Sequence, residues 1–467
     1  MTTTKTINPA TEETLEEIEL NSPQRVESVL RGADAAFRDW RKTTPSRRAE
    51  LLRAVAARLR DECDTHAGHI TREMGKPLSQ SRAEVLKCAL CCDYFAEHAP
   101  RMLQDEVAAS DAAESYVSFE PLGPILAVMP WNFPYWQVFR AAAPALMAGN
   151  VMLLKHALSV SRCALEIASV FKRGGVPTGV FQTLIINHDA VASLIDDDRV
   201  VAATLTGSER AGVSLARAAG ERIKKTVLEL GGSDAFIVLA DADLEQAAQT
   251  AAIARFQNTG QSCIAAKRFI VEAKVAAEFT ERLVRAVRGL RLGDPSHEDV
   301  YIGPLARADL RDELERQVRA SIDAGARLLT GGRRPNGKGY FYEPTLLTDV
   351  PLDCPAMTEE LFGPVAPIVT APTEDAAIAL ANATRFGLSN NLWTRDIPRA
   401  RRIARELSSG GVFINGMTAS DPRLPFGGIK KSGYGRELSS FGAREFVNVK
   451  TVWIGPDRGK QKPANVE

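Results

Sequence analysis

Three residues with reactive or polar side chains lie in short segments that interrupt apolar sequence: Cys263, Glu229 and Asn132. Cys263 ends the segment FQNTGQSC, whose small polar residues and glycine predict a loop. Glu229 lies in LELGG, at the end of an apolar run that predicts a strand. Asn132 lies in PWNFP, where two prolines restrict the backbone after another apolar run. A thiol, a carboxylate and a rigid amide are groups suited to chemistry at a carbonyl carbon.

Each of these groups has a defined role in such chemistry. A cysteine thiolate attacks the carbonyl carbon, and an amide N–H stabilises the resulting oxyanion. A carboxylate in apolar surroundings binds protons more tightly than usual and acts as a general base near neutral pH. Structural explanations remain open for each residue taken alone: a buried thiol, a glutamate paired with an unseen cation, and an asparagine that bonds its own turn.

A fourth segment, LTGSERAG, is typical of a phosphate-binding turn. Gly207 and Ser208 stand where a predicted strand gives way to a helix, so free backbone amides and a hydroxyl can hold a pyrophosphate. The Gly-x-Gly-x-x-Gly fingerprint is absent from the sequence, so a dinucleotide would have to be bound by other means.

The elements that must position these residues alternate regularly. Residues 24–103 have helical periodicity, and residues 114–130 have the pattern of a strand that becomes fully buried. Strand and helix patterns then alternate to residue 232 and again from residue 234 to about residue 415. This alternation predicts an α/β fold of two tandem doubly wound units with parallel sheets. A last amphipathic strand, residues 446–454, would pair with the isolated strand 115–119 of this chain or of another subunit.

Composition excludes several classes of protein. The 467 residues are 45% hydrophobic and 25% charged, which excludes a disordered chain. Lys plus Arg and Asp plus Glu both number 58, so no net charge favours nucleic acid or an anionic membrane. The N-terminus lacks the pattern of a signal peptide. No apolar run is long enough to span a bilayer. Seven cysteines are too few for a disulfide scaffold. We therefore expect a cytoplasmic protein with neither nucleic acid nor membrane as a partner.

Other motifs are better explained by structure than by chemistry. Cys88 and Cys91 have Cys-x-x-Cys spacing, but they lie in a helical pattern without a second pair, so we expect them to pack a helix face. His66 and His69 are expected at the surface, and no metal site is expected. Residues 332–338 resemble a phosphate loop without its final hydroxyl and instead predict a hairpin turn.

Six motifs together give the sequence a resemblance to a known family. PWNFP, TGS, LELGG, NTGQSC, EELFGPV (359–365) and PFGGIKKSG (425–433) occur in the order found in the aldehyde dehydrogenase superfamily. The resemblance covers essentially the whole chain, and details such as LLKHA, LELGGSD and GGVFING look most like bacterial succinate-semialdehyde dehydrogenases.

The resemblance implies roles for individual residues. Cys263 matches the nucleophile, Glu229 the base, and Asn132 the oxyanion donor, together with the Cys263 backbone amide. The implied mechanism is thiolate addition to an aldehyde, hydride transfer to NAD or NADP, and hydrolysis of the thioester by water that Glu229 activates. The implied cofactor-binding residues are Trp131, Asn132, Lys155, His156, Ala157, Leu158, Gly207, Ser208, Leu230, Glu360 and Phe362.

The resemblance also implies a division of the chain into domains. Residues 1–102 and 122–231 would form a dinucleotide-binding domain, and residues 232–440 a catalytic domain. Residues 103–121 and 441–457 would form a small β element for assembly into a homodimer or homotetramer.

Substrate and cofactor preference depend on three further positions. The distal carboxylate of succinic semialdehyde needs a cation, and Arg140 matches an arginine of the succinate-semialdehyde dehydrogenases. A second arginine of some relatives is Gln257 here, so we expect Arg423 to supply the second charge. The stretch Lys155-His156-Ala157-Leu158 lacks the glutamate that repels a 2′-phosphate in many family members, so we expect NADP to be accepted alongside NAD.

Alternative functions share part of this set of residues. They are oxidation of another small aliphatic or carboxylated aldehyde, a CoA-acylating dehydrogenase, a cofactor-independent thiol esterase, and a binding protein without activity. Glu229 argues against CoA acylation, and the TGS and EELFGP motifs argue against an esterase.

Overall fold

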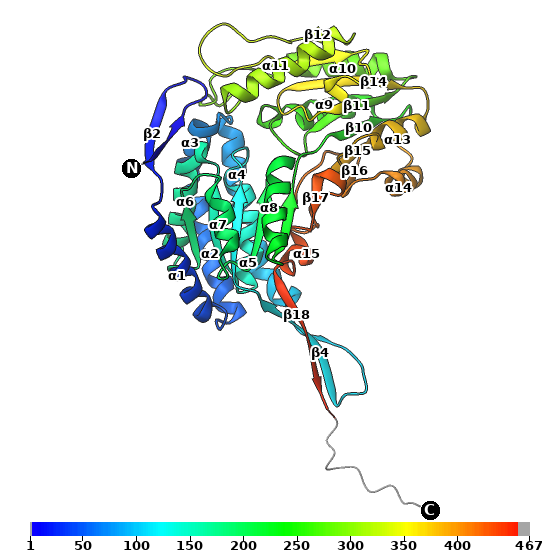
Figure 1. The fold of residues 1–467 in the computed structure, drawn as a ribbon. Helices are drawn as coiled ribbons and strands as arrows, with labels where there is room; N and C mark the ends of the chain where they lie inside the picture. The colour runs from blue at the N-terminus through cyan, green and yellow to red at the C-terminus, as the bar shows by residue number, and fades with distance from the viewer. Residues whose placement is uncertain (1, 456–467) are drawn as a thin grey trace, which may run out of the picture.

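The computed structural model describes residues 2–455, so positions 456 and 457 of the predicted segment 441–457 lie outside it. These residues form two large sheets, one of six and one of seven strands, and two small ones of three and two strands. In Figure 1 the six-stranded sheet and its helices lie at the lower left and the seven-stranded sheet at the upper right.

The six-stranded sheet has the order β17-β9-β8-β5-β6-β7. Its strands are β5 (Pro124–Met129), β6 (Val151–His156), β7 (Phe181–Leu184), β8 (Ala202–Thr206), β9 (Lys225–Glu229) and β17 (Gly433–Tyr434). All pairs are parallel except β17 with β9. The chain runs outward from β5 to β7 and then returns to β8 on the other side of β5. Ligands of such sheets bind beyond the carboxyl ends of the strands at this switch point, which is where PWNFP and the Gly207 turn follow β5 and β8.

Helices cover both faces of this sheet, which explains why β6 is buried along its whole length. These helices are α1 (Pro23–Trp40), α2 (Pro45–Asp61), α3 (Cys63–Met74), α4 (Leu78–Met102), α5 (Trp136–Met147), α6 (Ser161–Arg173), α7 (Ala190–Asp196) and α8 (Glu209–Glu221). Helix α5 begins directly after the PWNFP segment, so its first turn lies next to Asn132.

The seven-stranded sheet has the order β12-β13-β14-β11-β10-β15-β16 and is parallel except for the β12–β13 hairpin. Its strands are β10 (Asp234–Val238), β11 (Ala266–Glu272), β12 (Arg327–Thr330), β13 (Thr345–Thr348), β14 (Val365–Ala371), β15 (Ser389–Trp393) and β16 (Gly411–Ile414). Its helices are α9 (Leu244–Phe256), α10 (Ala276–Arg288), α11 (Ala308–Asp323), α12 (Pro355–Thr358), α13 (Glu374–Asn382) and α14 (Ile397–Glu406). Two α/β units with mainly parallel sheets confirm the predicted fold class.

A three-stranded sheet of order β18-β4-β3 projects from the lower end of the molecule (Figure 1). Strand β18 (Val447–Ile454) pairs antiparallel with β4 (Glu114–Pro121), and β3 (Glu106–Val107) pairs with the other edge of β4. The predicted last strand therefore pairs within this chain. At the other end of the sequence, β1 (Thr3–Ile7) and β2 (Thr14–Glu19) form a separate hairpin.

The motifs predicted to have structural rather than chemical roles can be compared with the structure. Cys88 and Cys91 are fully buried on α4, and residues 332–338 lie in the connection of the β12–β13 hairpin, as predicted. The expectation for His66 was wrong, because its ring is fully buried on α3 and bonds to the Tyr135 hydroxyl at 2.9 Å. Residues 2–455 contain no cluster of metal-ligating side chains and no helix long and apolar enough to cross a membrane.

Candidate active site

The Cys263 loop has an unusual backbone. It follows α9 through a short 3₁₀ segment, η2 (Gln257–Gly260), in which Asn258 and Thr259 both have φ near +55°. Gly260 also has positive φ, and a Cβ there would lie 2.3 Å from the Gly363 carbonyl oxygen. Non-glycine residues are strained in this region, the β-branched Thr259 more than Asn258, and persist there only where the surrounding structure enforces the conformation. The Cys263 side chain is half-buried at the end of this loop. The close approach at Gly260 requires a glycine for the loop to take this conformation.

Hydrogen bonds join the PWNFP segment to this loop. The Asn132 Nδ2 donates to the Gln261 carbonyl oxygen at 3.0 Å, and the Asn258 Nδ2 donates to the Asn132 carbonyl oxygen at 2.8 Å. On α5, the Gln137 Nε2 donates to the Asn132 Oδ1 at 3.1 Å. This bond fixes which end of the Asn132 amide is the donor, and Nδ2 is directed toward the segment that carries Cys263.

A buried ion pair supports the same segment from α4. Glu84 Oε1 accepts hydrogen bonds from the backbone N–H groups of Tyr135 and Trp136 at 2.9 and 3.0 Å, so it caps the start of α5. Its other oxygen pairs with the Lys76 ammonium, which lies 3.8 Å from the centre of the Phe133 ring. The two charged side chains are almost completely buried.

Glu229 is the last residue of β9 and is 2% exposed. Neither of its carboxylate oxygens has a hydrogen-bond partner among the described residues. A Cβ on Gly427 would lie 2.7 Å from its Oε1, so only a glycine fits beside the carboxylate. Burial and the neighbouring Glu437 raise the pKa of Glu229 well above its ordinary value. A carboxylate with a raised pKa is a stronger base than an ordinary one, which is consistent with the role of a general base that the sequence predicts.

Arg140 interacts with several charged or titratable groups of the site. It is 2% exposed, forms an ion pair with buried Glu437, donates to the Thr206 hydroxyl at 3.3 Å, and stacks on Phe426 at 4.5 Å. Its charge lowers the pKa of both Glu229 and Cys263. Arg140 is thus part of the same buried cluster as the nucleophile and the base.

Burial raises the pKa of the Cys263 thiol to about 11, while Lys267 and Arg140 lower it. The Lys267 Nζ donates to the Cys263 carbonyl oxygen at 2.7 Å and lies 3.1 Å from Glu360 Oε1. Sequence reasoning did not assign a role to Lys267. The one local indication was that a charged residue, Lys267, begins the strand segment 266–272 shortly after Cys263.

The predicted dinucleotide residues surround the carboxyl ends of β6, β8 and β9. Ser208 caps α8 by accepting from the Ala211 N–H, and the Gly207 N–H donates to the Glu229 carbonyl oxygen at 3.0 Å. Lys155, 1% exposed at the end of β6, contacts His188 Nδ1 at 3.2 Å and forms no ion pair among the described residues. A buried ammonium without an ion-pair partner and the nearby first turn of α8 suit a phosphorylated dinucleotide.

At the other end of this region, Phe362 meets the Trp131 ring edge-on, with centroids 5.7 Å apart. Glu360 Oε1 accepts from the Gly232 N–H at 3.1 Å. Leu230 is buried so close to α8 that a Cβ on Gly212 would lie 2.7 Å from it. Lys267 connects this group to the Cys263 loop, because its Nζ lies 3.1 Å from Glu360 Oε1 and 5.9 Å from the centre of the Phe362 ring and donates to the Cys263 carbonyl oxygen.

Two residues that the sequence predicts to bind cofactor or substrate, His156 and Arg423, use their polar groups in contacts within the chain. His156 is buried, its Nε2 donates to the Pro134 carbonyl oxygen and its Nδ1 accepts from Ala157 N–H, so both nitrogens are used inside the chain. Ala157 and Leu158 follow it as half-buried residues. Arg423 is exposed at the surface, where its guanidinium bonds to Asp421 at 2.8 and 2.6 Å. The structure does not bring Arg423 into the buried cluster.

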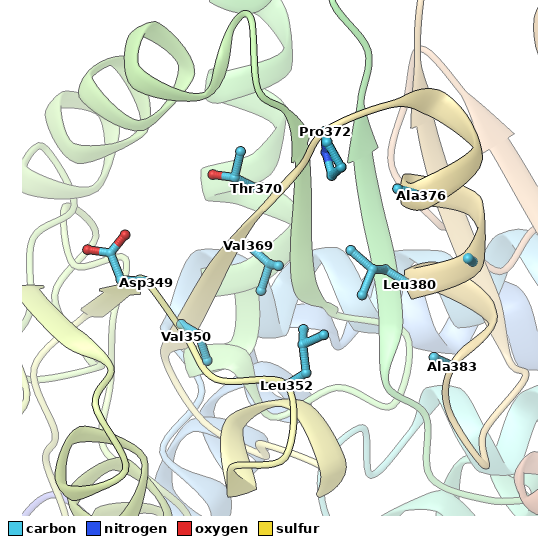
Figure 2. A pocket seen from close by; sticks show the side chains of 10 residues that line it. Asp349, Val350, Leu352, Val369, Thr370, Pro372, Ala376, Leu380 and Ala383 are labelled. Carbon is cyan, nitrogen blue, oxygen red and sulfur yellow. The ribbon is translucent and has the colours of Figure 1, made fainter.

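A separate apolar pocket of about 610 Å³ lies between β14 and α13. Figure 2 shows Val350, Val369 and Leu380 directed into it. It contains none of the predicted site residues, so it is distinct from the Cys263 cluster.

Known proteins resemble this chain along its whole length. A family model described as "Aldehyde dehydrogenase family" matches residues 1–452. A probable succinate-semialdehyde dehydrogenase [NADP(+)] of Synechocystis sp. is 53% identical over 449 residues, which is 96% of this chain and 99% of that protein. Succinate semialdehyde dehydrogenase [NAD(P)+] Sad of Escherichia coli is 52% identical over 96% of this chain and 97% of that protein.

Solved structures agree with these relatives. Succinic semialdehyde dehydrogenase from Streptococcus pyogenes in complex with NADP+ has a TM-score of 0.95 and 38% identity, over 97% of this chain and 100% of that chain. The structure described as showing cofactor and substrate selection by Gox0499 has a TM-score of 0.96 and 41% identity, with the same coverage.

Proposed function

We propose, on the premise that the chain belongs to the aldehyde dehydrogenase family, that it oxidises succinic semialdehyde to succinate with NAD or NADP as the oxidant. The balanced reaction consumes the aldehyde, one water and one oxidised dinucleotide, and yields the carboxylate, the reduced dinucleotide and two protons. Relatives named for this reaction, at 52–53% identity over nearly the whole chain, support the choice of substrate.

One observation carries the proposal. The Asn132 amide is tied to the Cys263 loop, while Glu229 lies in the same charge cluster with both oxygens free of hydrogen bonds. Nucleophile, oxyanion donor and base are thus gathered at the switch point of a parallel sheet, beside residues that suit a dinucleotide.

The chain's own residues account for the steps at the carbonyl carbon. The Cys263 thiol gives up its proton to water, and the thiolate Sγ forms a bond to the aldehyde carbon while the C=O π bond breaks. The oxygen becomes an oxyanion that accepts hydrogen bonds from Asn132 Nδ2 and the Cys263 N–H. When bound, the oxidised nicotinamide supplies the hydride acceptor that makes the adduct a thioester. Glu229 then takes a proton from water, whose oxygen attacks the thioester carbon, and the C–S bond breaks to release the acid.

Three residues and one helix turn would hold the dinucleotide. Ser208 and the first turn of α8 would bind the pyrophosphate, Lys155 the adenosine ribose, and Glu360 the nicotinamide ribose. We infer that NADP is accepted alongside NAD, because the buried Lys155 ammonium, 3.2 Å from His188 Nδ1, has no carboxylate partner among the described residues and exposed Arg210 adds positive charge near His188. Positive charge of this kind favours a 2′-phosphate.

A panel of aldehydes tests this function. The purified protein should reduce NADP and NAD with succinic semialdehyde at a kcat/KM well above that for butanal, and added CoA should not increase the rate. Acyl-CoA formation would favour the acylating alternative, and acid release from thioesters without dinucleotide reduction would favour an esterase. Rejection of NADP would contradict the inference about the cofactor.

We also propose assembly into a homodimer or homotetramer in the cytoplasm. Strand β18 is an edge strand, and Val449 and Trp453 on it are exposed by 62% and 52%. An exposed edge with apolar side chains favours pairing with another chain. The seven cysteines are all free thiols, which suits a reducing compartment. Light scattering of the purified protein measures the assembly, and a monomer would contradict it.

A further inference from the structure

Arg255, in the last turn of α9, is a fully buried cation that the proposed mechanism does not use. Its guanidinium forms no ion pair within residues 2–455, and the hydrogen bonds that it donates there all end on backbone carbonyl oxygens. Burial lowers the pKa of Arg255 to about 9, which leaves it charged at neutral pH. Because a buried charge without a counterion is costly, the carbonyl dipoles around Arg255 have to compensate for that cost.

These carbonyl groups belong mainly to two segments that the proposed reaction uses. One is the nucleophile loop, residues 257–263, which ends at Cys263. The other is the nicotinamide segment, residues 359–364, which contains Glu360 and Phe362 and forms neither helix nor strand. Because it lacks regular structure, the nicotinamide segment depends in part on distant side chains for its backbone hydrogen bonds.

A single nitrogen of Arg255 bonds to both segments. Its Nη2 donates to the Gly260 carbonyl oxygen of the nucleophile loop at 3.3 Å and to the Leu361 carbonyl oxygen of the nicotinamide segment at 2.9 Å. The same nitrogen also donates to the Gly363 carbonyl oxygen. Phe362 is the residue between these last two carbonyl groups, so Arg255 holds the backbone on both sides of the Phe362 ring.

The two segments also touch directly beside this side chain. A Cβ on Gly260 would lie 2.3 Å from the Gly363 carbonyl oxygen and 3.0 Å from the Arg255 Nη2. The preceding residues, Asn258 and Thr259, have positive φ, and that strain has to be offset by surrounding contacts. The bond from Arg255 to Gly260 is one such contact, so Arg255 stabilises the place where the nucleophile loop meets the nicotinamide segment.

Loss of Arg255 would affect the two segments unequally. The nucleophile loop has other donors to its carbonyl groups, among them Asn132 Nδ2 at 3.0 Å and Lys267 Nζ, which lies 2.7 Å from the Cys263 oxygen. The Leu361 carbonyl group has no other donor in the part of the chain that the structure describes. Without Arg255, we therefore expect the nicotinamide segment to shift while Cys263 keeps its place.

We propose that Arg255 is a positioning residue for hydride transfer, because it holds the nicotinamide segment in a fixed place relative to Cys263. It acts on the reaction through Glu360 and Phe362, to which the cofactor is assigned, and not through a contact of its own. This inference deepens the proposed function and rests on it. A shift of about 1 Å between reacting groups can lower a rate about 100-fold, so the effect on hydride transfer should be large.

Two rate constants measured on each variant separate positioning from stability. The first is the rate of the first turnover, followed by stopped-flow absorbance of the reduced nicotinamide at saturating NADP and succinic semialdehyde. Deuterium at the aldehyde carbon identifies the hydride step, because it slows that step alone. The second is the rate of alkylation of Cys263 by iodoacetamide without dinucleotide, which reports on the thiol and its loop.

Three variants make the comparison. Arg255→Met removes the charge and the donors, whereas Arg255→Lys keeps the charge and loses the planar fork of donors. Arg48→Met is the matched control, since Arg48 of α2 is also buried, without an ion pair among the described residues, and donates to the backbone carbonyl groups of Arg41, Thr43 and Met147.

The expected result is a change in the ratio of the two rates. Arg255→Met should lower the first-turnover rate by about 100-fold and the alkylation rate by less than about threefold, with a deuterium effect on the first turnover. Arg255→Lys should lower the first-turnover rate by about tenfold, again with little change in alkylation. Arg48→Met should lower the urea unfolding midpoint and leave the ratio as in the wild type.

Several results would overturn the proposal. An unchanged ratio in Arg255→Met would do so, whether both rates fall together or neither falls, and so would a first turnover without a deuterium effect. The same change of ratio in Arg48→Met would show a general consequence of losing a buried arginine. If Arg255→Met does not fold, the ratio in Arg255→Lys decides by the same criteria. A wild type that reduces no dinucleotide with this aldehyde would refute the proposed function itself, whereas normal wild-type turnover with an unchanged ratio refutes only the role of Arg255.

Discussion

Replacing Glu84 by glutamine should weaken both the fold and the reaction, although Glu84 touches neither substrate nor cofactor. Glu84 neutralises buried Lys76 and caps the first turn of α5 next to Asn132. Glutamine has the same shape and can still accept from the Tyr135 and Trp136 N–H groups. The substitution therefore removes one charge without changing the volume of the buried side chain.

The magnitude follows from the burial of the pair. Lys76 and Glu84 have side chains 1% and 2% exposed, so the Lys76 ammonium would be left uncompensated. Removing one partner of a buried ion pair typically costs about 3–5 kcal/mol. Within that sum, each of the two backbone hydrogen bonds weakens by about 1 kcal/mol when its acceptor loses its charge. Burial already lowers the pKa of Lys76, so this lysine can lose its proton, which places the expected cost near the lower end.

The assay compares urea unfolding midpoints and kcat for the wild type, Glu84→Gln and the double variant Lys76→Met/Glu84→Gln. The double variant replaces the stranded ammonium by an apolar side chain, and such replacements of buried ion pairs are often close to neutral. It should regain at least about 2 kcal/mol relative to Glu84→Gln. Displacement of Asn132 should lower kcat about tenfold or more in Glu84→Gln, with partial recovery in the double variant.

Two outcomes would refute this reasoning. One is a Glu84→Gln protein that unfolds at the urea concentration of the wild type, because the ion pair would then contribute nothing. The other is a double variant no more stable than Glu84→Gln, because the loss would then not come from an uncompensated charge on Lys76.

Three further results are expected from the site. Asn132→Ala should lower kcat by about 100- to 1,000-fold with an unchanged urea unfolding midpoint, since one oxyanion donor is lost; a loss below about tenfold would contradict this role. Glu229→Gln should stop deacylation, so mass spectrometry should find an acyl group on Cys263 after mixing with aldehyde and NADP; an unmodified protein that turns over normally would contradict it. Burial raises the pKa of Cys263 to about 11, and only the thiolate reacts, so inactivation of the free enzyme by iodoacetamide should accelerate about tenfold per pH unit between about pH 7 and pH 10; a plateau near pH 8 would show a thiol with an ordinary pKa.

The alternation of strands and helices was enough to predict the fold class. Buried parallel strands such as 151–156 have continuous apolar sequence, because helices cover both faces of the sheet. Glu229 and Asn132 were identified because a polar side chain stands where apolar strand sequence ends, and Cys263 because it ends a loop of small polar residues. The family resemblance then assigned their roles. Their chemical roles remain predictions until the variants above are measured.

The supporting residues were not identified, because their partners are distant in the sequence. Glu84 and Lys87 lie in α4, whose share of charged residues is ordinary, and nothing local shows that one caps α5 and the other contacts Ser420. His66 was expected at the surface, yet it shares a buried helix face with Ile70 and Met74, at spacings of four residues. The position of Arg423 could have been predicted from the sequence, because Asp421 lies two residues before it and accepts hydrogen bonds from its guanidinium.

Substitution of Cys263 by alanine tests the central claim most directly. Dinucleotide reduction by Cys263→Ala is followed in the absorbance of the reduced nicotinamide, with NADP binding measured as proof of an intact fold. The account predicts that turnover falls by at least about 10⁴-fold, because the carbonyl carbon loses its nucleophile while the cofactor residues remain. Turnover within tenfold of the wild type would contradict it.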